Sequence, residues 1–430
     1  MEEKKLKTKF GELFTEKELK EVREKFAYVD HDFVGNKRIF FDNAGGALRL
    51  TKAEEVFKKV DLVPDCSEHS NKIALMLKKI DEQGRADIRT IFNAKKGSLV
   101  FGFTASQLMM QAMRVVAASV KGTNVVTTAL EHPSAFDALK IQARKYNWEL
   151  RIAHANKLTG GIDTETILNL IDKNTAILSV MSASNISGHI MDVSTVASRA
   201  REINPDIIIV SDAVQHAPHG VLNPEQNGID VMNIAPYKFF SIRGMGLMYM
   251  SERVNKIEHD QVECLPDDMW ELGSPSTAQF AAITEIVNYV CELGKHKLKS
   301  STNRRELFEL GMERIANHER ALLEIMLEGT DAVKGLRYID GVKVLMDDPD
   351  LYQRDLITGI EFANMGPQQA CAELEKRGIV AFERVASSEF SARMVHEFDS
   401  EGIVRISPLH VNTPEEIEQF LHAVKEVAAL

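Results

Sequence analysis

SDAVQH, residues Ser211–His216, ends one apolar run of the sequence, and APYK, residues Ala235–Lys238, ends the next. The runs themselves, Ile207–Val210 and Val231–Ile234, have the length of buried strands and do not alternate with polar residues. Such continuously apolar strands are typical of a parallel sheet that is covered by helices on both faces. The sequence therefore predicts an aspartate and a lysine at the ends of two neighbouring buried strands.

The segments around these two runs repeat the same alternation of short strands and helices. Such alternation predicts an α/β fold with a mostly parallel sheet and helices on both sides. Further expected strands are Leu99–Phe103, Asn124–Leu130, Ala176–Met181 and Leu247–Met250, and the expected helices between them are Gln107–Val120, Ala135–Tyr146, Asp163–Ile171 and Val193–Arg201.

From about Gly273 the sequence pattern changes to two long helical stretches followed by a mixture of strands and helices, which predicts a smaller α+β domain. We expect three parts: an N-terminal segment, residues 1–40, packed on the small domain; a large domain, residues 41–290; and the small domain, residues 291–430. Expected elements here are helices Thr277–Lys299, Arg304–Leu327 and Pro367–Arg377, strands Gly341–Leu345, Asp355–Phe362, Ile379–Ala381 and Gly402–Ile406, and a final helix from Thr413.

Composition limits the class of protein. The chain has 430 residues, of which 44% are hydrophobic and 27% charged, as in an ordinary globular protein. Its formal net charge of -11 disfavours nucleic-acid and anionic-membrane partners. Four scattered cysteines predict neither a disulfide framework nor a metal site, and they suit a reducing compartment. With no signal-peptide pattern at the N-terminus, we expect a cytoplasmic protein.

Asp212 and Lys238 suit one cofactor in particular, pyridoxal 5′-phosphate (PLP). A carboxylate at the end of a buried strand keeps the pyridine nitrogen of PLP protonated, so that the ring can accept electrons. A lysine amine forms a Schiff base with the aldehyde and later moves protons. Apolar and aromatic neighbours desolvate such an amine and lower its pKa. The structural alternative is a lysine that extends past an aromatic cluster into solvent.

Polar residues at the ends of other strands are further candidates, because ligands of α/β sheets lie there. Thr104, Ala105 and Ser106 open a helix and offer donors to a phosphate, although a simple helix cap has the same composition. His132 could stack on the cofactor ring and move protons, or it could be structural. Asn185 could reach the phenolic oxygen of the cofactor or a substrate carboxylate, or it could only shape a turn.

Four more polar residues lie in or near these stretches. Gln215 could contact the phenolate oxygen, and the Tyr237 hydroxyl could contact the phosphate. Arg243 could bind a phosphate or a carboxylate, or it could be a surface residue. Arg405 is a cation inside the apolar stretch IVRIS. It could clamp the α-carboxylate of a substrate, or it could form an internal salt bridge.

Taken together, the stretches from FDNAGG (Phe41–Gly46) to RISPLHVNT (Arg405–Thr413) resemble the class V aminotransferase-like PLP enzymes of fold type I. This superfamily includes cysteine desulfurases, selenocysteine lyases, kynureninases and several aminotransferases. The resemblance implies a mostly parallel seven-stranded sheet with helices on both faces and a smaller C-terminal α+β domain. It also implies a homodimer with shared active sites, in which Ser274 looks like the phosphate ligand lent to the partner.

The resemblance assigns a role to each candidate. It implies phosphate binding by Thr104, Ala105 and Ser106, ring stacking by His132, pairing of Asp212 with the pyridine nitrogen, contact of Gln215 with the phenolic oxygen, an internal aldimine at Lys238, and binding of the substrate carboxylate by Arg405.

The sequence also departs from the desulfurase pattern. Desulfurases commonly have a histidine just before the lysine and a nearby serine, where this chain has Tyr237 and Ala235. Desulfurases also need a nucleophilic cysteine on a mobile loop, and the matching stretch, Arg384–Ser391, contains none. Serine cannot replace it, because persulfide formation requires a thiol. Sulfur transfer by the usual route is therefore not expected.

These observations predict a PLP-dependent enzyme that acts on a small amino acid. Transamination is the favoured reaction. The alternative is a cysteine desulfurase, a selenocysteine lyase or another β-eliminating lyase. An alternative of another class is a non-catalytic scaffold or sensor with the same fold. The intact set of Asp212, Gln215 and Lys238 argues against that last possibility.

Overall fold

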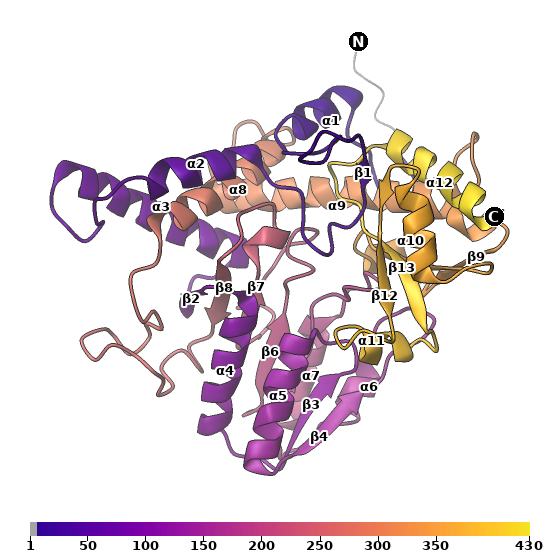
Figure 1. The fold of residues 1–430 in the computed structure, drawn as a ribbon. Coiled ribbons are helices and arrows are strands. Elements are labelled where there is room, and N and C mark those ends of the chain that lie inside the picture. The colour runs from indigo at the N-terminus through magenta and orange to yellow at the C-terminus, as the bar shows by residue number, and fades with distance from the viewer. Residues whose placement is uncertain (1–6) are drawn as a thin grey trace.

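The computed structural model describes residues 7–430 and shows a large sheet domain joined to a smaller domain (Figure 1). The large sheet has seven strands, as the resemblance implies. Strand β8 is antiparallel to both of its neighbours, and the other pairs are parallel. Across the sheet the order is β2 (Ser98–Gly102), β8 (Gly246–Met250), β7 (Val231–Ile234), β6 (Ile208–Asp212), β5 (Thr175–Ser179), β3 (Asn124–Thr128) and β4 (Glu149–Ala153).

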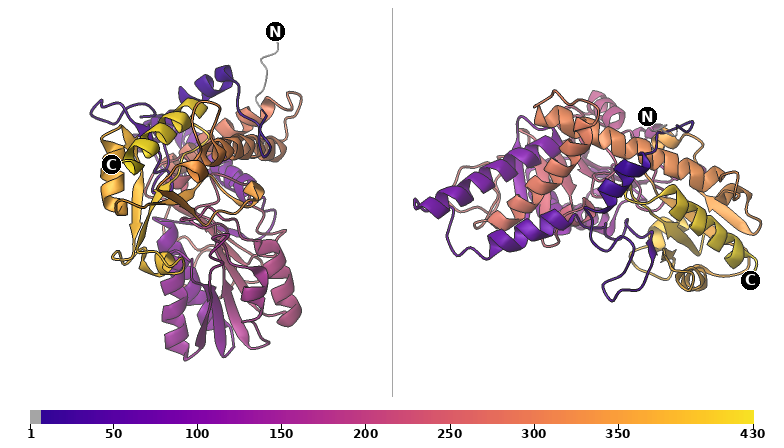
Figure 2. Two further views of the ribbon diagram at one scale, coloured as in Figure 1. Left: turned by 90° about the vertical axis from the view of Figure 1, so that its right-hand side faces the viewer. Right: turned by 90° about the horizontal axis from the view of Figure 1, so that it is seen from above.

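Helices cover both faces of this sheet (Figure 2). Side chains alternate along a strand, so Val125 and Val126 of β3 point to opposite faces. Val125 packs in the core formed with α4 and α5, whereas Val126 belongs to the core formed with α6, α7 and α8. The bounds of these helices are α4 (Ala105–Ser119), α5 (Pro133–Tyr146), α6 (Thr164–Leu168), α7 (Val193–Ile203) and α8 (Thr277–Lys295).

The six strands predicted for the large sheet are all present, with small shifts at their ends. The seventh strand, β4, was not predicted from the residue pattern. It lies at the edge of the sheet and its sequence, ELRIA, is only partly buried. An edge strand needs less apolar sequence than a central one, and β4 therefore lacks the signal that marks its neighbours.

The small domain is built on a four-stranded antiparallel sheet. The sequence placed Arg384 at the start of a loop, but the structure places it inside β12, next to β13. This sheet has the order β12 (Phe382–Val385), β13 (Gly402–Ile406), β10 (Thr358–Phe362) and β9 (Val342–Leu345), and its helices are α9 (Arg304–Glu328), α10 (Pro367–Glu375), α11 (Ala392–His396) and α12 (Pro414–Ala428).

The N-terminal segment contacts the small domain along much of its length. The backbone N–H groups of Lys9 and Phe10 donate to Glu324 on α9. Strand β1 (Ile39–Phe40) pairs in parallel with β11 (Ile379–Val380). Residues 1–6, which belong to the predicted N-terminal segment, lie outside the described residues. The predicted large-domain boundary at residue 290 falls within α8, which runs without a break to Lys295.

The remaining α-helices of residues 7–430 are α1 (Glu16–Arg23), α2 (Thr51–Asp61) and α3 (Lys72–Phe92), and three short 3₁₀ helices are η1 (Pro236–Lys238), η2 (Leu336–Tyr338) and η3 (Leu351–Gln353). Helices α2, α3 and α8 lie together on the side away from the small domain (Figure 1). Within residues 7–430 no helix has the length and apolar character needed to cross a membrane.

Candidate active site

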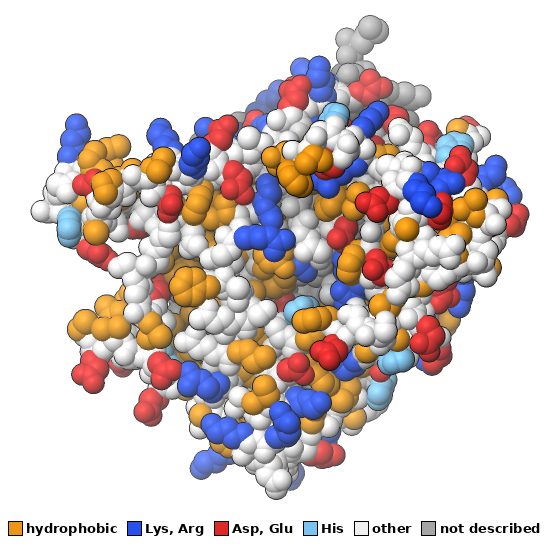
Figure 3. All heavy atoms as spheres, viewed as in Figure 1, with side chains coloured by type: hydrophobic (Ala, Val, Ile, Leu, Met, Phe, Trp, Pro, Cys, Tyr) orange, Lys and Arg blue, Asp and Glu red, His pale blue; other side chains and the backbone are white. Residues whose placement is uncertain are grey.

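A cavity of about 380 Å³ lies at the carboxyl ends of the parallel strands. Its size is typical of a site for a small ligand or cofactor. A recess opens between the two domains, with basic side chains and a histidine around it (Figure 3). Ten of the twelve predicted site residues line the cavity: Thr104, Ala105, Ser106, His132, Asn185, Asp212, Gln215, Tyr237, Lys238 and Arg243. The other two, Arg405 and Ser274, do not.

Asp212 and Lys238 face this cavity from adjacent strands. Asp212 is the last residue of β6 and pairs in register with Asn233 of β7, and Lys238 follows at the end of a short 3₁₀ turn, Pro236–Lys238. The Lys238 Nζ atom lies 3.4 Å from Oε1 of Gln215. Both charged side chains are less than one-tenth exposed. The fold therefore brings the predicted acid, amine and amide into one buried group.

Burial disfavours the charged form of both residues. Desolvation, followed by the positive charge of Arg405, lowers the pKa of Lys238 to about 8. Desolvation also raises the pKa of Asp212, although Asp212 accepts a 2.9 Å hydrogen bond from the Val214 N–H group. A cationic ring nitrogen beside Asp212 would compensate for that desolvation, so the carboxylate suits the pyridine nitrogen of PLP.

The lowered pKa of Lys238 leads to a prediction for the cofactor-free protein. Between about pH 8, the pKa of folded Lys238, and pH 10.5, the usual pKa of a lysine amine, the unfolded chain holds a proton that folded Lys238 has lost. Unfolding then takes up a proton, so stability should rise with pH across this window and be flat below it. We expect a gain of at most about 3 kcal/mol relative to Lys238→Met, measured by denaturant unfolding from pH 7 to 10.5. Parallel curves for the two proteins would contradict the buried-amine assignment.

His132 caps the N-terminus of α5 and faces the same cavity. Its Nδ1 atom accepts a hydrogen bond from the Ser134 N–H group at 3.2 Å and lies 2.7 Å from Ser134 Oγ. Desolvation, with the nearby charges of Lys238 and Arg384, lowers the pKa of His132 to about 4. The imidazole is therefore neutral near pH 7 and, because Nδ1 is an acceptor, its proton is on Nε2.

The helix α4 begins at the opposite end of the cavity, where Thr104, Ala105 and Ser106 lie. Thr104 Oγ1 accepts a hydrogen bond from the Gln107 N–H group. Thr104 therefore caps the helix, which is the alternative role considered for it in the sequence. Helix N-terminal N–H groups suit a phosphate. Gly246 of β8 lies so close to this turn that a Cβ atom would come 2.4 Å from the carbonyl carbon of Thr104. Only glycine allows this approach, and the close packing leaves a turn that is chemically suited to a phosphate group.

Tyr237 and Arg243 border the cavity nearby. The Arg243 guanidinium stacks 4.4 Å from the centre of the Tyr237 ring. Arg243 is exposed and, within residues 7–430, forms no ion pair with an acidic side chain. A free cation beside a tyrosine hydroxyl is chemically suited to a phosphate or a carboxylate.

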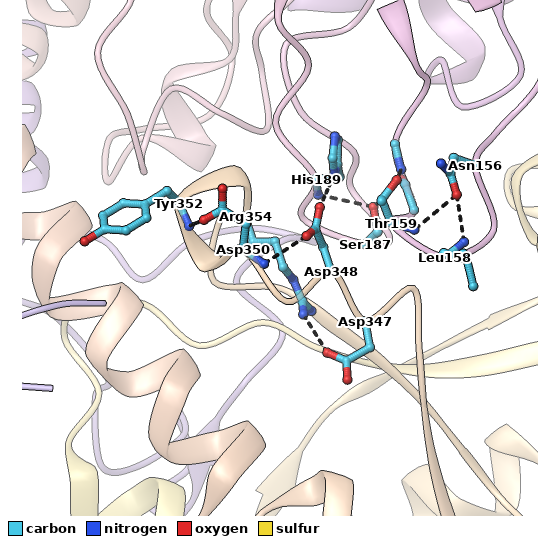
Figure 4. A network of polar contacts seen from close by, with 12 residues as sticks. Asn156, Leu158, Thr159, Ser187, His189, Asp347, Asp348, Asp350, Tyr352 and Arg354 are labelled. Carbon is cyan, nitrogen blue, oxygen red and sulfur yellow. Dashed lines mark hydrogen bonds and ion pairs between the residues drawn. The ribbon is translucent and has the colours of Figure 1, made fainter. Parts of the chain in front are cut away.

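Asn185 lies on the loop after β5. Ser187 and His189 of the same loop lie beside residues of the small domain (Figure 4). Ser187 Oγ donates to the Gly160 carbonyl at 2.7 Å and accepts from the His189 N–H group. His189 in turn lies 3.4 Å from the Asp348 carboxylate of the small domain. The buried Oδ1 atom of Asn185 has no partner within the described residues. A cavity-lining amide with an unpaired oxygen fits a hydrogen-bonding ligand.

Arg405 is engaged inside the protein. Its Nη2 atom lies 2.8 Å from Asp42 Oδ1, and its Nη1 atom donates to the Asn185 carbonyl at 3.1 Å. The internal salt bridge that the sequence left open as an alternative is thus present. Ser274 lies on an exposed loop, and its hydroxyl donates to Glu68 of the same chain.

A clasp, formed by Arg393 and Glu397, holds the segment after β12 on the large domain. Arg393 donates to the backbone carbonyls of Ala129 and Glu131, next to His132. Glu397 accepts from the Ala155 N–H group at 2.9 Å and lies 3.0 Å from His154 Nδ1. The stretch that matches the cysteine-bearing loop of desulfurases, Arg384–Ser391, comes directly before this clasp. The clasp therefore fixes the C-terminal end of that stretch on the large domain.

Sequence reasoning missed several residues around the site. Asn233 donates to the Ala105 carbonyl at 3.2 Å and so links β7 to the start of α4. Glu131 is fully buried, and desolvation raises its pKa to about 8. Asp42, which pairs with Arg405, and Arg393, which holds the backbone near His132, were not selected either. Glu131 could have been selected from the sequence, because it is a charged residue at the end of a predicted buried strand, directly before His132. The roles of Asn233, Asp42 and Arg393 depend on contacts with residues distant in sequence.

Comparisons with known proteins identify the family of this chain. The family model for aminotransferase class-V matches residues 39–420. A probable cysteine desulfurase from Borreliella burgdorferi is 22% identical, with 95% of this chain and 96% of the relative aligned. Another from Synechocystis is also 22% identical, with 94% of each chain aligned.

Solved structures show the same fold. A cysteine desulfurase from Thermococcus onnurineus superposes with a TM-score of 0.77 at 20% identity, over 95% of this chain and 98% of that one. A cysteine desulfurase from Escherichia coli gives the same TM-score and coverage at 16% identity. The large sheet with helices on both faces is therefore the fold type I architecture. With the family model matching most of its length, the chain belongs to the class V aminotransferase family of PLP-dependent enzymes.

Proposed function

We propose that this enzyme is a β-eliminating lyase. It would remove a substituent from the β-carbon of a small L-amino acid, with cysteine as the first candidate, and release that substituent without binding it to a protein thiol. The sequence favoured transamination and kept elimination as the alternative. The relatives named as cysteine desulfurases support the alternative better.

The observation that carries this proposal is a lysine-containing cavity with no cysteine among its lining residues. Cys291 and Cys371 are at least partly buried, and desolvation raises their pKa values to about 11 and about 12. Thiols with such high pKa values are poor nucleophiles at neutral pH. Cys66 and Cys264 are exposed. Within residues 7–430, none of the four cysteines lines the cavity, so a sulfur relay there would lack a thiol beside Lys238.

The residues around the cavity would divide the work. Asp212 would hold the pyridine nitrogen, Gln215 and Asn185 would orient the phenolic oxygen, and the first turn of α4 would hold the phosphate. When bound, PLP supplies an electron sink for the bond that breaks at the α-carbon. The Lys238 amine, with a pKa of about 8, would take the α-proton and return it to the departing group. Neutral His132 would cover the cavity beside it.

We further propose that two copies of the chain form the working unit. Ser274 lies outside its own cavity on an exposed loop, as a residue that serves the partner's phosphate site should. A shared site would make activity depend on dimer formation.

Product analysis tests the reaction. With L-cysteine, elimination consumes water and yields equal amounts of pyruvate, ammonia and sulfide. Desulfuration yields alanine and transfers sulfur to an added thiol, and transamination leaves the amino group on the cofactor without releasing ammonia. We expect the first pattern from the PLP-loaded enzyme. Alanine as the main product, or aminated cofactor without ammonia, would refute the proposal.

A further inference from the structure

Two histidines on the loop after β6, His216 and His219, have no part in the proposed chemistry. The same loop carries Gln215, whose Oε1 atom lies 3.4 Å from the Nζ atom of Lys238. The loop forms a compact turn, because the backbone N–H groups of His219 and Gly220 both donate to the His216 carbonyl. Gln215 directly precedes this turn, so the position of the turn sets the position of Gln215 relative to Lys238.

Each of these histidines contacts the small domain. His219 Nδ1 lies 2.7 Å from Glu319 Oε2 on α9, and the two side chains are only 4% and 3% exposed. His216 Nδ1 lies 3.0 Å from Oδ2 of Asp355, shortly before β10. One turn of the large domain is therefore held at two points by separate elements of the small domain.

Glu319 is itself held in one position. Its other carboxylate oxygen, Oε1, accepts a 3.0 Å hydrogen bond from the His410 N–H group, in the segment after β13. The Nε2 atom of His410 in turn lies 2.7 Å from the Tyr289 hydroxyl of α8. Both oxygens of Glu319 are therefore engaged, and this carboxylate cannot turn away from His219 without losing a second contact.

The contact between His219 and Glu319 is an ion pair. Desolvation disfavours both charged forms, but the opposite charge outweighs it in each case: Glu319 raises the pKa of His219, and His219 lowers the pKa of Glu319. The Asp355 carboxylate also raises the pKa of His219, whereas the positive charge of Lys238 lowers it. Because the pair interacts electrostatically with Lys238, a test of its positional role must leave the net charge unchanged.

We propose that the contacts of this turn with the small domain, above all the buried His219–Glu319 pair, position Gln215. The surroundings of the Lys238 amine then depend on how the small domain contacts the loop after β6. His219 and Glu319 are positioning residues, since neither lines the cavity that the described residues form. The inference rests on the proposed function in one respect, that Gln215 faces the bound cofactor.

The visible absorbance of the PLP-loaded enzyme tests this proposal without any turnover. The lysine-bound cofactor absorbs at different wavelengths with and without a proton on the lysine nitrogen, so the pH midpoint of this change reports the surroundings of Lys238. We expect Gln215→Leu to shift the midpoint by about one pH unit, because it removes a hydrogen-bonding partner of that group.

The uncharged-pair variant, His219→Leu with Glu319→Gln, removes the ion pair without changing the net charge, and it keeps a carbonyl oxygen for the His410 N–H group. It should shift the midpoint in the same direction as Gln215→Leu, by at least about half as much. Adding Gln215→Leu to this variant should give the shift of Gln215→Leu alone, because the pair acts through Gln215.

The matched control is His296→Leu. His296 lies 3.3 Å from Glu18 in a histidine–glutamate pair at the end of α8, and its loss should leave the midpoint unchanged. If the uncharged-pair variant does not fold, His216→Leu with Asp355→Asn removes the second contact of the turn and serves instead. An unchanged midpoint in the folded variant, a shift that adds in full to that of Gln215→Leu, or no shift in Gln215→Leu itself would overturn the proposal. Because no substrate is present, the result is independent of which products the enzyme makes.

Discussion

Lys238→Ala should abolish turnover, with a loss of about 10³-fold or more. Within residues 7–430, Lys238 is the only lysine that lines the cavity, and its Nζ atom lies 3.4 Å from Gln215 Oε1. Under the proposed function, its removal would take away both the covalent attachment of the cofactor and the base for the α-proton, and proton transfer alone contributes about 10²- to 10⁴-fold. The measurements are kcat on the best substrate and the visible absorbance of the lysine-bound cofactor, which should vanish.

Two controls separate this role from general damage. Lys238→Arg keeps a positive charge but cannot form the covalent link, and it should be nearly as inactive. Lys376→Ala removes an exposed lysine that pairs with Glu373 and should leave kcat unchanged. A Lys238→Ala enzyme that stays within tenfold of the parent would mean that another group performs the chemistry.

The largest effect on stability is expected from Gly311→Ala. Gly311 of α9 lies against α8, and a Cβ atom there would come 2.0 Å from the Val290 carbonyl oxygen. Gly294 of α8 meets the Leu307 carbonyl of α9 in the same way. The contact is with backbone, which no side-chain rotation can relieve. The two helices must move apart, so we expect a loss of about 3 kcal/mol or more.

Denaturant unfolding of the two proteins measures this loss. Gly273→Ala is the matched control, because no atom lies within 4 Å of the added Cβ and its φ is not positive. It should change the free energy of unfolding by less than about 1 kcal/mol. Equal stability of the Gly311 and Gly273 variants would show that α8 and α9 can separate without cost.

Much of the large domain could be predicted because its signals are local. The apolar runs that became β6 and β7, and the polar residues directly after them, are continuous in sequence and gave the positions of Asp212 and Lys238. Strand β4 escaped because an edge strand is only partly buried. Strand β12 escaped for a similar reason, since its residues range from exposed to half-buried. Because β12 was not predicted, the sequence did not indicate that Arg384 lies on a strand next to the one that holds Arg405.

The contacts between distant segments could not be predicted in this way. Asp42 and Arg405 are separated by 363 positions, and nothing in either neighbourhood indicates that they form an ion pair. The role expected for Arg405 depended on whether such a partner existed. The choice between transamination and elimination was also beyond the residue pattern, because both reactions need the same acid, amine and histidine.

The clasp of Arg393 and Glu397 affects how a group released from the substrate can leave the active site. A desulfurase delivers sulfur on a thiol that swings outward to meet an acceptor protein. Here the residues directly after the corresponding stretch are bound to the backbone beside His132 and to the chain just after β4. Because both ends of this stretch are fixed, by β12 and by the clasp, its reach is short, and under the proposed function we expect the released group to leave the site as a small molecule.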